Sequence, residues 1–299
     1  MPHLSLPLLH AGVSGYPEGF LHSSWHFAPS VVVGIAGLIA AYILWTGPLN
    51  RRRPGAEDRP VTRGQSVAFL GGCLALFVAL GQPLDDWSDA YLLSAHMFQH
   101  LLLMLLVPPL WLLGLPAWVL EPLTRRPWIN RIGLTLTRAP VAFAIAGITL
   151  AAWHLPSLYD AALRHQPVHI LEHQMFLVTS ILVWWPIVGP LPAWPRLSKP
   201  LQCLYLFLLT FPSGIVGAFI TLGSTGLYAA YDNAPRLWGM SLQTDQVIAG
   251  LMMWVFGNLI YLALITVIFF QWSSEAERAE QEAATIPSVA GRLPTTTHP

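Results

Sequence analysis

The feature that most constrains the fold of this chain is a series of seven long apolar runs. A helix needs about 20 mostly apolar residues to cross the hydrocarbon core of a bilayer, which is about 30 Å thick. Each run approaches or exceeds that length and contains few charged residues. We therefore expect an all-α membrane protein, a bundle of seven transmembrane helices within these ranges: Phe27 to Thr46, Gly64 to Leu80, Tyr91 to Leu113, Arg138 to His154, Val168 to Pro186, Lys199 to Leu222 and Asp245 to Gln271.

Composition agrees with a membrane protein and argues against other classes. Hydrophobic residues make up 54% of the chain and charged residues only 10%, whereas about 25% of the residues of a soluble domain are charged. The formal net charge is zero, so no positive field attracts phosphates. We therefore expect membrane lipid around the helices, no nucleic-acid partner and no water-soluble enzyme.

The sequence divides into three segments. Residues 1–26 are an extracytoplasmic segment without the basic start of a cleavable signal peptide, so we expect it to stay attached. Residues 27–271 contain the seven-helix transmembrane domain. Residues 272–299 begin with several glutamates and then become rich in Pro, Thr and Ala. We expect a short helical extension there, followed by a largely disordered cytoplasmic tail.

The distribution of basic residues predicts the orientation of the bundle, because cytoplasmic loops retain Lys and Arg. With alternating spans, 13 of the 15 basic residues fall on one side of the membrane, and only Arg164 and Arg236 fall on the other. We therefore expect the N-terminus outside and the C-terminus in the cytoplasm.

The histidines concentrate on the predicted outer side. Ten of the 11 lie in the outer segments or in the outer halves of helices. His96 and His100 are four residues apart, as are His169 and His173, so each pair projects from one face of a helix. Ionisable side chains inside a membrane are costly and usually face the bundle interior. We therefore predict a metal or haem site formed by these two pairs.

Neighbouring residues extend the candidate site and indicate the metal. Glu172 offers an oxygen ligand or an acceptor that orients an imidazole. Imidazole combined with thioether sulfur favours copper, particularly Cu(I), over hard cations. The candidate ligands for copper are, in full, His96, His100, His154, His169, His173, Glu172, Asp245 and Met253.

Structural interpretations of the same residues remain open. A histidine in a membrane helix also makes interhelical hydrogen bonds, and methionines commonly fill gaps in a core. Asp245 lies near the start of its span, where a carboxylate also compensates the helix dipole. His22 and His26 have the same spacing as the two pairs but lie at a helix entrance, where packing is the simpler role.

Several segments together resemble the CtaG family of caa3-type cytochrome c oxidase assembly factors, from about residue 25 to about residue 270. The segments are His96–Met104, Pro108–Leu110, Trp153–Pro156 with Tyr159, His169 with Glu172 and His173, and the pairs Asp245–Gln246, Ala249–Gly250 and Met253–Trp254. The resemblance implies a multi-pass protein of the bacterial plasma membrane that is needed to form active copper-containing oxidase. Its matching positions are His96, His100, His154, His169, Glu172, His173 and Asp245.

Three functions follow as hypotheses. The first is a non-enzymatic assembly factor that binds copper at the outer histidines and assists its delivery to subunit I or II of the oxidase. The alternative is a b-type haem or di-metal redox protein that uses the same histidines. A transporter is the third, and only Gly214 and Gly217, which follow Pro212, hint at the broken helix that many transporters contain.

Overall fold

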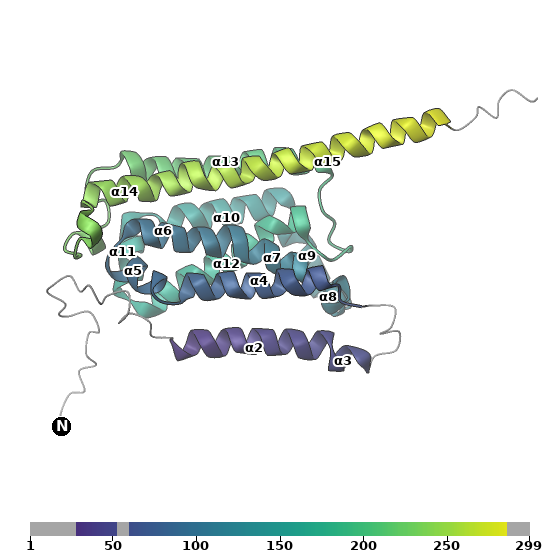
Figure 1. Ribbon diagram of the computed structural model, residues 1–299, viewed down its shortest axis with the longest axis horizontal. Helices are drawn as coiled ribbons and strands as arrows, with labels where there is room; N and C mark the ends of the chain where they lie inside the picture. Colours follow the sequence, from purple (N-terminus) through teal and green to yellow (C-terminus); the bar gives the residue numbers. More distant parts are fainter. Residues whose placement is uncertain (1–27, 53–59, 286–299) are drawn as a thin grey trace, which may run out of the picture.

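The protein is described from a computed structural model that covers residues 28–52 and 60–285. In these ranges the chain forms helices and no strands. The long helices lie side by side in one bundle, and α2 lies at its edge, where it packs on α4 and where the Tyr42 hydroxyl donates to the carbonyl of Gly114 at 3.0 Å (Figure 1). This arrangement confirms the predicted all-helical fold.

Six helical stretches are long and apolar enough to cross a membrane. They are α2 and α3 (Pro29–Arg51), α4 (Arg63–Leu80), α6 to α7 (Leu93–Gly114), α12 (Gln166–Val188), α13 (Lys199–Leu222) and α14 to α15 (Leu242–Glu282). Each corresponds to one of the apolar runs in the sequence. The chain is therefore a multi-pass membrane protein by the length and composition of its helices.

The fourth expected span differs from the prediction. α10 (Ala139–Trp153) has 15 residues, which at about 1.5 Å per residue reach only about 22 Å. α9 (Pro127–Leu136) precedes it and is bent away by 70°, so the count reaches seven only if this pair forms one span. The break has a local cause: Pro140 has no N–H to donate to the carbonyl of Leu136, four residues earlier.

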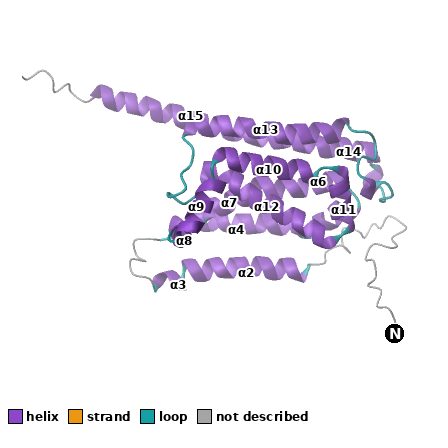
Figure 2. Ribbon diagram, turned by 180° about the vertical axis from the view of Figure 1, so that it is seen from behind, coloured by secondary structure: helices purple, strands orange, loops and turns teal. Residues whose placement is uncertain are grey.

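Short helices cover the two ends of the bundle (Figures 1 and 2). One end carries α5 (Leu84–Ala90), α11 (Pro156–Arg164) and the turns η2 (Ala229–Tyr231) and η3 (Leu237–Gly239). The opposite end carries α3 (Pro48–Arg51), α8 (Ala117–Thr124) and α9. We call the first the α5 end and the second the α3 end.

Two spans contain a π-helical turn. η1 (Leu102–Leu106) separates α6 (Leu93–Leu101) from α7 (Val107–Gly114), and η4 (Met252–Phe256) separates α14 (Leu242–Leu251) from α15 (Gly257–Thr285). Such turns interrupt the regular ladder of helical hydrogen bonds and are frequent at functional sites.

The π-helical turn η1 leaves a backbone carbonyl that a tryptophan satisfies. The donors to the Met104 carbonyl would be residues 108 and 109, both prolines without an N–H. Trp184 on α12 donates its indole N–H to this carbonyl at 2.8 Å. This hydrogen bond ties the third span to the fifth in the middle of the bundle.

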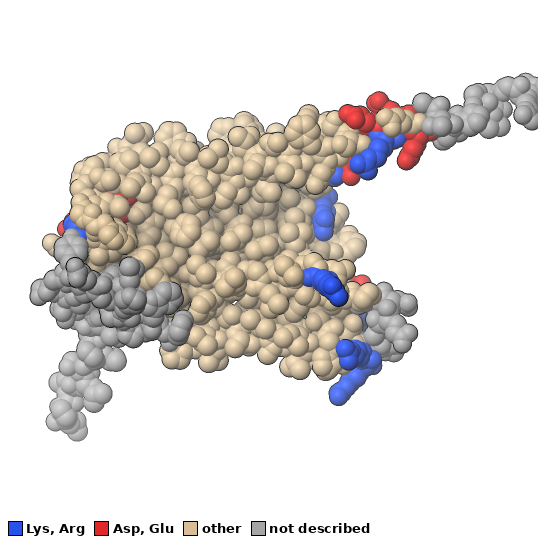
Figure 3. Space-filling model, in the orientation of Figure 1, with Lys and Arg blue, Asp and Glu red and all other residues tan. Residues whose placement is uncertain are grey.

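Charge is distributed unevenly between the two ends. In the view of Figure 3, most Lys and Arg gather at the α3 end and along the extension of α15. α15 continues to Thr285, beyond the expected end of the span at residue 271. The predicted N-terminal segment and the final part of the tail lie outside the described residues.

Candidate metal centre

The first helix of the site, α6, is held in place by Asp245 of α14. α6 begins at Leu93 and its N-cap makes no side-chain hydrogen bond. Instead, Asp245 Oδ2 accepts the amide of Leu93 at 2.8 Å, and Oδ1 accepts the amide of Ser94 at 3.0 Å and its hydroxyl at 2.5 Å. A carboxylate at this position also stabilises the helix dipole. These contacts fix the height of His96 and His100 in the bundle.

The hydrogen bonds of Asp245 indicate a role other than the predicted one of metal ligand. The sequence placed it among the metal ligands, but both of its oxygens accept hydrogen bonds from α6. Its side chain is also buried, with 1% exposure. The alternative interpretation as compensation of a helix dipole applies to two helices, because Asp245 lies in the first turn of its own helix, α14, and also at the start of α6.

The second helix of the site, α12, presents one polar face to the bundle interior. His169, Glu172 and His173 are spaced at i, i+3 and i+4, so they share that face. Their exposed fractions are 5%, 0% and 8%, respectively. A charged or polar residue in this position faces protein and not lipid, as expected inside a membrane.

α6 and α12 bring four potential ligands together. His96, His169, Glu172 and His173 each offer a nitrogen or oxygen atom, and these atoms all lie within 4.8 Å of one another. The ring centroid of His96 lies 5.3 Å from that of His169 and 6.0 Å from that of His173. We call these four residues the His/Glu cluster.

His100 lies directly beside the His/Glu cluster. Its Nε2 is 2.8 Å from Nε2 of His96 and 3.9 Å from Oε1 of Glu172. The ring is buried, with 1% exposure. The structure therefore brings the two predicted pairs together, with His100 at the inner edge of the cluster.

His154 is farther from the cluster. It follows the end of α10, and its Nδ1 donates to the carbonyl of Leu150 at 2.8 Å. Its ring centroid is 5.8 Å from that of His100. The backbone hydrogen bond fixes the proton on Nδ1 and leaves Nε2 of His154 as a lone pair.

Several polar atoms of the cluster have no hydrogen-bond partner in the protein although they are buried. They are both carboxylate oxygens of Glu172, Nε2 of His169 and Nε2 of His173. Most buried polar atoms in proteins are paired, because an unpaired one loses the hydration that it has in water. Three imidazoles and a carboxylate are ligands that transition metals bind. The donor set and its burial therefore fit a metal cation.

Two aspartates on α5, which are not among the ligands expected from the sequence, belong to the surroundings of the site. Oδ2 of Asp89 lies 3.6 Å from Nδ1 of His169, and Oδ1 of Asp85 accepts a hydrogen bond from Gln99 at 2.9 Å. Burial raises the pKa of Asp89 to about 7 and that of Asp85 to about 6. The signal in the sequence was the acidic run at residues 85–89.

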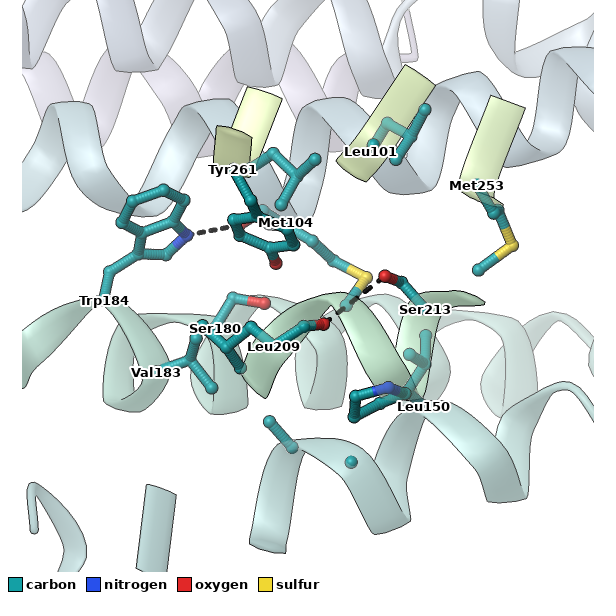
Figure 4. Close-up of a pocket in the computed structure, with 15 residues that line it drawn as sticks. Leu101, Met104, Leu150, Ser180, Val183, Trp184, Leu209, Ser213, Met253 and Tyr261 are labelled. Atoms are coloured by element: carbon teal, nitrogen blue, oxygen red, sulfur yellow. Dashed lines mark hydrogen bonds between the residues drawn. The ribbon is translucent and has the colours of Figure 1, made fainter. Parts of the chain in front are cut away.

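Met253 lies in the wall of an apolar cavity in the middle of the bundle, where Met104 also projects (Figure 4). We call this space the inner cavity, and most of its lining is aliphatic or aromatic. Met253 also packs in the same core cluster as Phe176, whose ring lies 4.7 Å from that of His100. This packing of Met253 agrees with the alternative interpretation in which a methionine fills a gap in the core.

Three tyrosines cover the cluster from the α5 end, and two of them were missed in the sequence. Tyr159, Tyr228 and Tyr231 are almost fully buried, with 0%, 2% and 1% exposure. Tyr159 belongs to the segments that resemble the CtaG family, whereas Tyr228 and Tyr231 lie in and beside a turn without helical spacing. No pattern in the sequence connects that turn with α6.

The remaining histidines do not join the cluster among the described residues. His165, at the start of α12, is exposed. The candidates His22 and His26 lie outside the described residues, as do His3, His10 and His298.

The bundle and its buried His/Glu cluster define a multi-pass helical membrane protein with a candidate metal centre. The sequence matches the cytochrome c oxidase caa3 assembly factor (Caa3_CtaG) family over residues 40–275. The chain belongs to this family.

Similar proteins include uncharacterized proteins of Mycobacterium bovis and Mycobacterium tuberculosis, each 27% identical over 270 residues. A third, from Mycobacterium leprae, is 25% identical over 275 residues. Each alignment covers 85% of this chain but 40% of the relative. The chain thus spans about two fifths of the length of these relatives. No solved structure matches the chain.

Proposed function

We propose that this protein is a membrane assembly factor for cytochrome c oxidase that binds copper in the His/Glu cluster and assists its delivery to the oxidase. The observation that carries this proposal is the set of four ligating side chains within 4.8 Å of one another. Membership of the caa3 assembly factor family supports the oxidase as the recipient.

Copper is the metal that best combines the donor set with the family. Imidazole binds zinc, copper, iron and nickel, and the affinity of such sites for divalent ions peaks at copper. Copper is also a metal that a caa3-type oxidase requires. The three histidines supply neutral donors, and Glu172 supplies one negative charge that offsets part of the charge of the ion.

The orientation of the bundle supports loading from outside the cytoplasm. The His/Glu cluster lies near the α5 end, where α5 supplies Asp85 and Asp89. Lys and Arg concentrate at the α3 end (Figure 3), which by the positive-inside rule faces the cytoplasm. In this orientation, the copper would enter from the outer side.

Delivery requires that the ion leave the site again. Ligand exchange with a copper-binding subunit of the oxidase, subunit I or II, is the simplest route. The protein would then act without catalysing a reaction, as a carrier in the cell membrane.

The same histidines were also candidates for a b-type haem. A bis-histidine haem needs its two axial ligands on opposite sides of a flat macrocycle. Here His169 and His173 have ring centroids 4.2 Å apart, and both rings lie against His96. This close contact of imidazoles favours an ion over a macrocycle.

The test is to purify the full chain in detergent, load it with Cu(I) without oxygen and measure bound copper by mass spectrometry. The double variant His96→Ala/His169→Ala is compared with His165→Ala, whose exposed histidine lies outside the cluster. We expect the double variant to lose the copper and the His165 variant to keep it. Equal copper in all three proteins would refute the site, and a Soret band in the protein as isolated would favour haem.

A further inference from the structure

The tyrosine layer makes a specific contact with the His/Glu cluster. Tyr231 is the last residue of η2, and its hydroxyl reaches the cluster from the loop between α13 and α14. Tyr159 on α11 lies beside it, with ring centroids 6.3 Å apart, and Tyr228 stacks on Tyr159 at 3.9 Å. The Tyr231 hydroxyl is therefore held in place by buried aromatic packing.

Three polar atoms surround the Tyr231 hydroxyl. The carbonyl oxygen of Ser88 is 2.6 Å away, the hydroxyl of Tyr159 is 3.1 Å away, and Nδ1 of His96 is 3.3 Å away. All of these residues are buried. No bulk water competes with the hydrogen bonds among them.

The chemistry of these groups determines the direction of each hydrogen bond. A carbonyl oxygen only accepts, so the single proton of Tyr231 goes to Ser88, the shortest of the three contacts. The Tyr231 oxygen then accepts from its other two neighbours. Tyr159 donates its hydroxyl proton, and His96 donates a proton from Nδ1.

We propose that Tyr231 is a positioning residue that keeps the proton of His96 on Nδ1 and thereby presents the Nε2 lone pair of His96 to the cation. A neutral imidazole has one N–H, so protonation of Nδ1 leaves Nε2 free to bind. Hydrogen bonds from the other ring nitrogen orient metal-binding histidines in the same way in many metal sites. The assignment of the cation rests on the proposed function, whereas the position of the proton does not.

The same arrangement assigns a proton to His100. If His96 Nε2 is a lone pair, the contact of 2.8 Å between the two Nε2 atoms requires that His100 donate. In the metal-free protein His100 therefore carries its proton on Nε2, and its buried Nδ1 has no partner. A cation that binds His96 Nε2 therefore displaces the hydrogen bond from His100, whose own free lone pair lies on Nδ1. His96 and His100 form one i, i+4 pair in the sequence, but they differ in which ring nitrogen carries the proton.

The test measures the position of the proton in the metal-free protein. Full-length protein labelled with ¹⁵N-histidine is reconstituted in lipid at neutral pH, and solid-state NMR reports which ring nitrogen carries the proton. The His96 signals are assigned by their loss in a His96→Gln variant. We expect the Nδ1–H tautomer of His96 in the native protein and a mixture, or the Nε2–H tautomer, in Tyr231→Phe.

Two matched variants separate this effect from a change of packing. Tyr228→Phe removes a hydroxyl from the same layer, one that donates to the carbonyl of His154 at 2.9 Å. Tyr159→Phe removes a neighbour of Tyr231 but leaves the acceptor for His96. We expect both variants to keep the native tautomer of His96. Nε2–H in the native protein, or the native tautomer in a folded Tyr231→Phe variant, would overturn the proposal.

Copper titration distinguishes this proposal from the proposed function. If the native chain binds copper, we expect Tyr231→Phe to weaken binding by about 10-fold or more, as loss of such a hydrogen bond does in other metal sites. The Tyr228 and Tyr159 variants should stay near the native affinity. Unchanged affinity in Tyr231→Phe would contradict the positioning role. A native chain without copper affinity would instead refute the proposed function, and the NMR result would still decide the proton position.

Discussion

The inner cavity and the His/Glu cluster lie in the same bundle but differ in whether their buried polar atoms have hydrogen-bond partners. Around the cavity, buried polar groups have partners: Trp184 donates to the backbone carbonyl of Met104, and the Ser213 hydroxyl donates to the side-chain oxygen of Asn258 at 2.9 Å. In the cluster, by contrast, both oxygens of Glu172 have none in the protein. The first arrangement stabilises a fold, whereas the second is typical of a site that binds a ligand.

The largest expected effect on stability comes from Asp245, which lies on α14 and caps the start of α6. Asp245→Ala removes a buried carboxylate that accepts three hydrogen bonds from α6. We expect a loss of about 3 kcal/mol in the free energy of unfolding, measured by SDS titration. Asp245→Asn, which keeps two acceptor sites on one oxygen, should lose less. Native copper stoichiometry in a folded Asp245→Asn variant would show that Asp245 is not a ligand, and native stability of Asp245→Ala would contradict its capping role.

Breaking the hydrogen bond beside the inner cavity should reduce stability without affecting copper. Trp184→Phe leaves the Met104 carbonyl without a donor, because residues 108 and 109 are prolines. We expect a loss of about 2 kcal/mol, measured in the same titration. Copper stoichiometry should remain native, since Trp184 does not contact the cluster. A loss of copper at native stability would contradict the separation of the two regions.

Substitution of Glu172 should have effects opposite to those of Trp184→Phe, on both stability and copper binding. Glu172→Leu removes a fully buried carboxyl group with no partner in the protein. We expect the metal-free protein to gain about 1 kcal/mol of stability, because functional sites commonly sacrifice stability. The same variant should bind copper less tightly. A marked destabilisation of the metal-free protein would show that Glu172 supports the fold.

At the edge of the cluster, the expected effect is on copper affinity and not on stability. Asp89→Asn weakens the interaction with Nδ1 of His169, which lies 3.6 Å away. We expect copper affinity to fall by about 10-fold in a competition titration with a chelator. Asp160→Asn, on α11 and paired with Arg164, serves as the control and should keep native affinity. Equal affinities of the two variants would remove Asp89 from the site.

Much of the fold follows from the sequence, because length and apolarity alone determine which segments can cross a membrane. The fourth span is the exception, since the bend before α10 depends on Pro140 and on the packing of α9. The start of this span was close to the expected one, since the expected span began at residue 138 and α10 begins at residue 139. The bend before it was not expected. Hydropathy does not report the direction in which a chain turns.

The site was predictable only in its residue types and spacing. The i, i+4 pairs show that His96 and His100, or His169 and His173, share a helix face, but they do not show which helices are neighbours. The cap that Asp245 provides to α6 joins residues about 150 positions apart. The contact between Tyr231 and His96 spans 135 positions. Such contacts depend on tertiary packing, which no local pattern encodes.

The most direct test of the central claim is a copper K-edge absorption spectrum of the purified, copper-loaded protein. Our account predicts a first coordination shell of nitrogen and oxygen, with the multiple-scattering signature of imidazole, that disappears in His96→Ala/His169→Ala. A shell dominated by sulfur, or an unchanged spectrum in the double variant, would contradict copper binding by the His/Glu cluster.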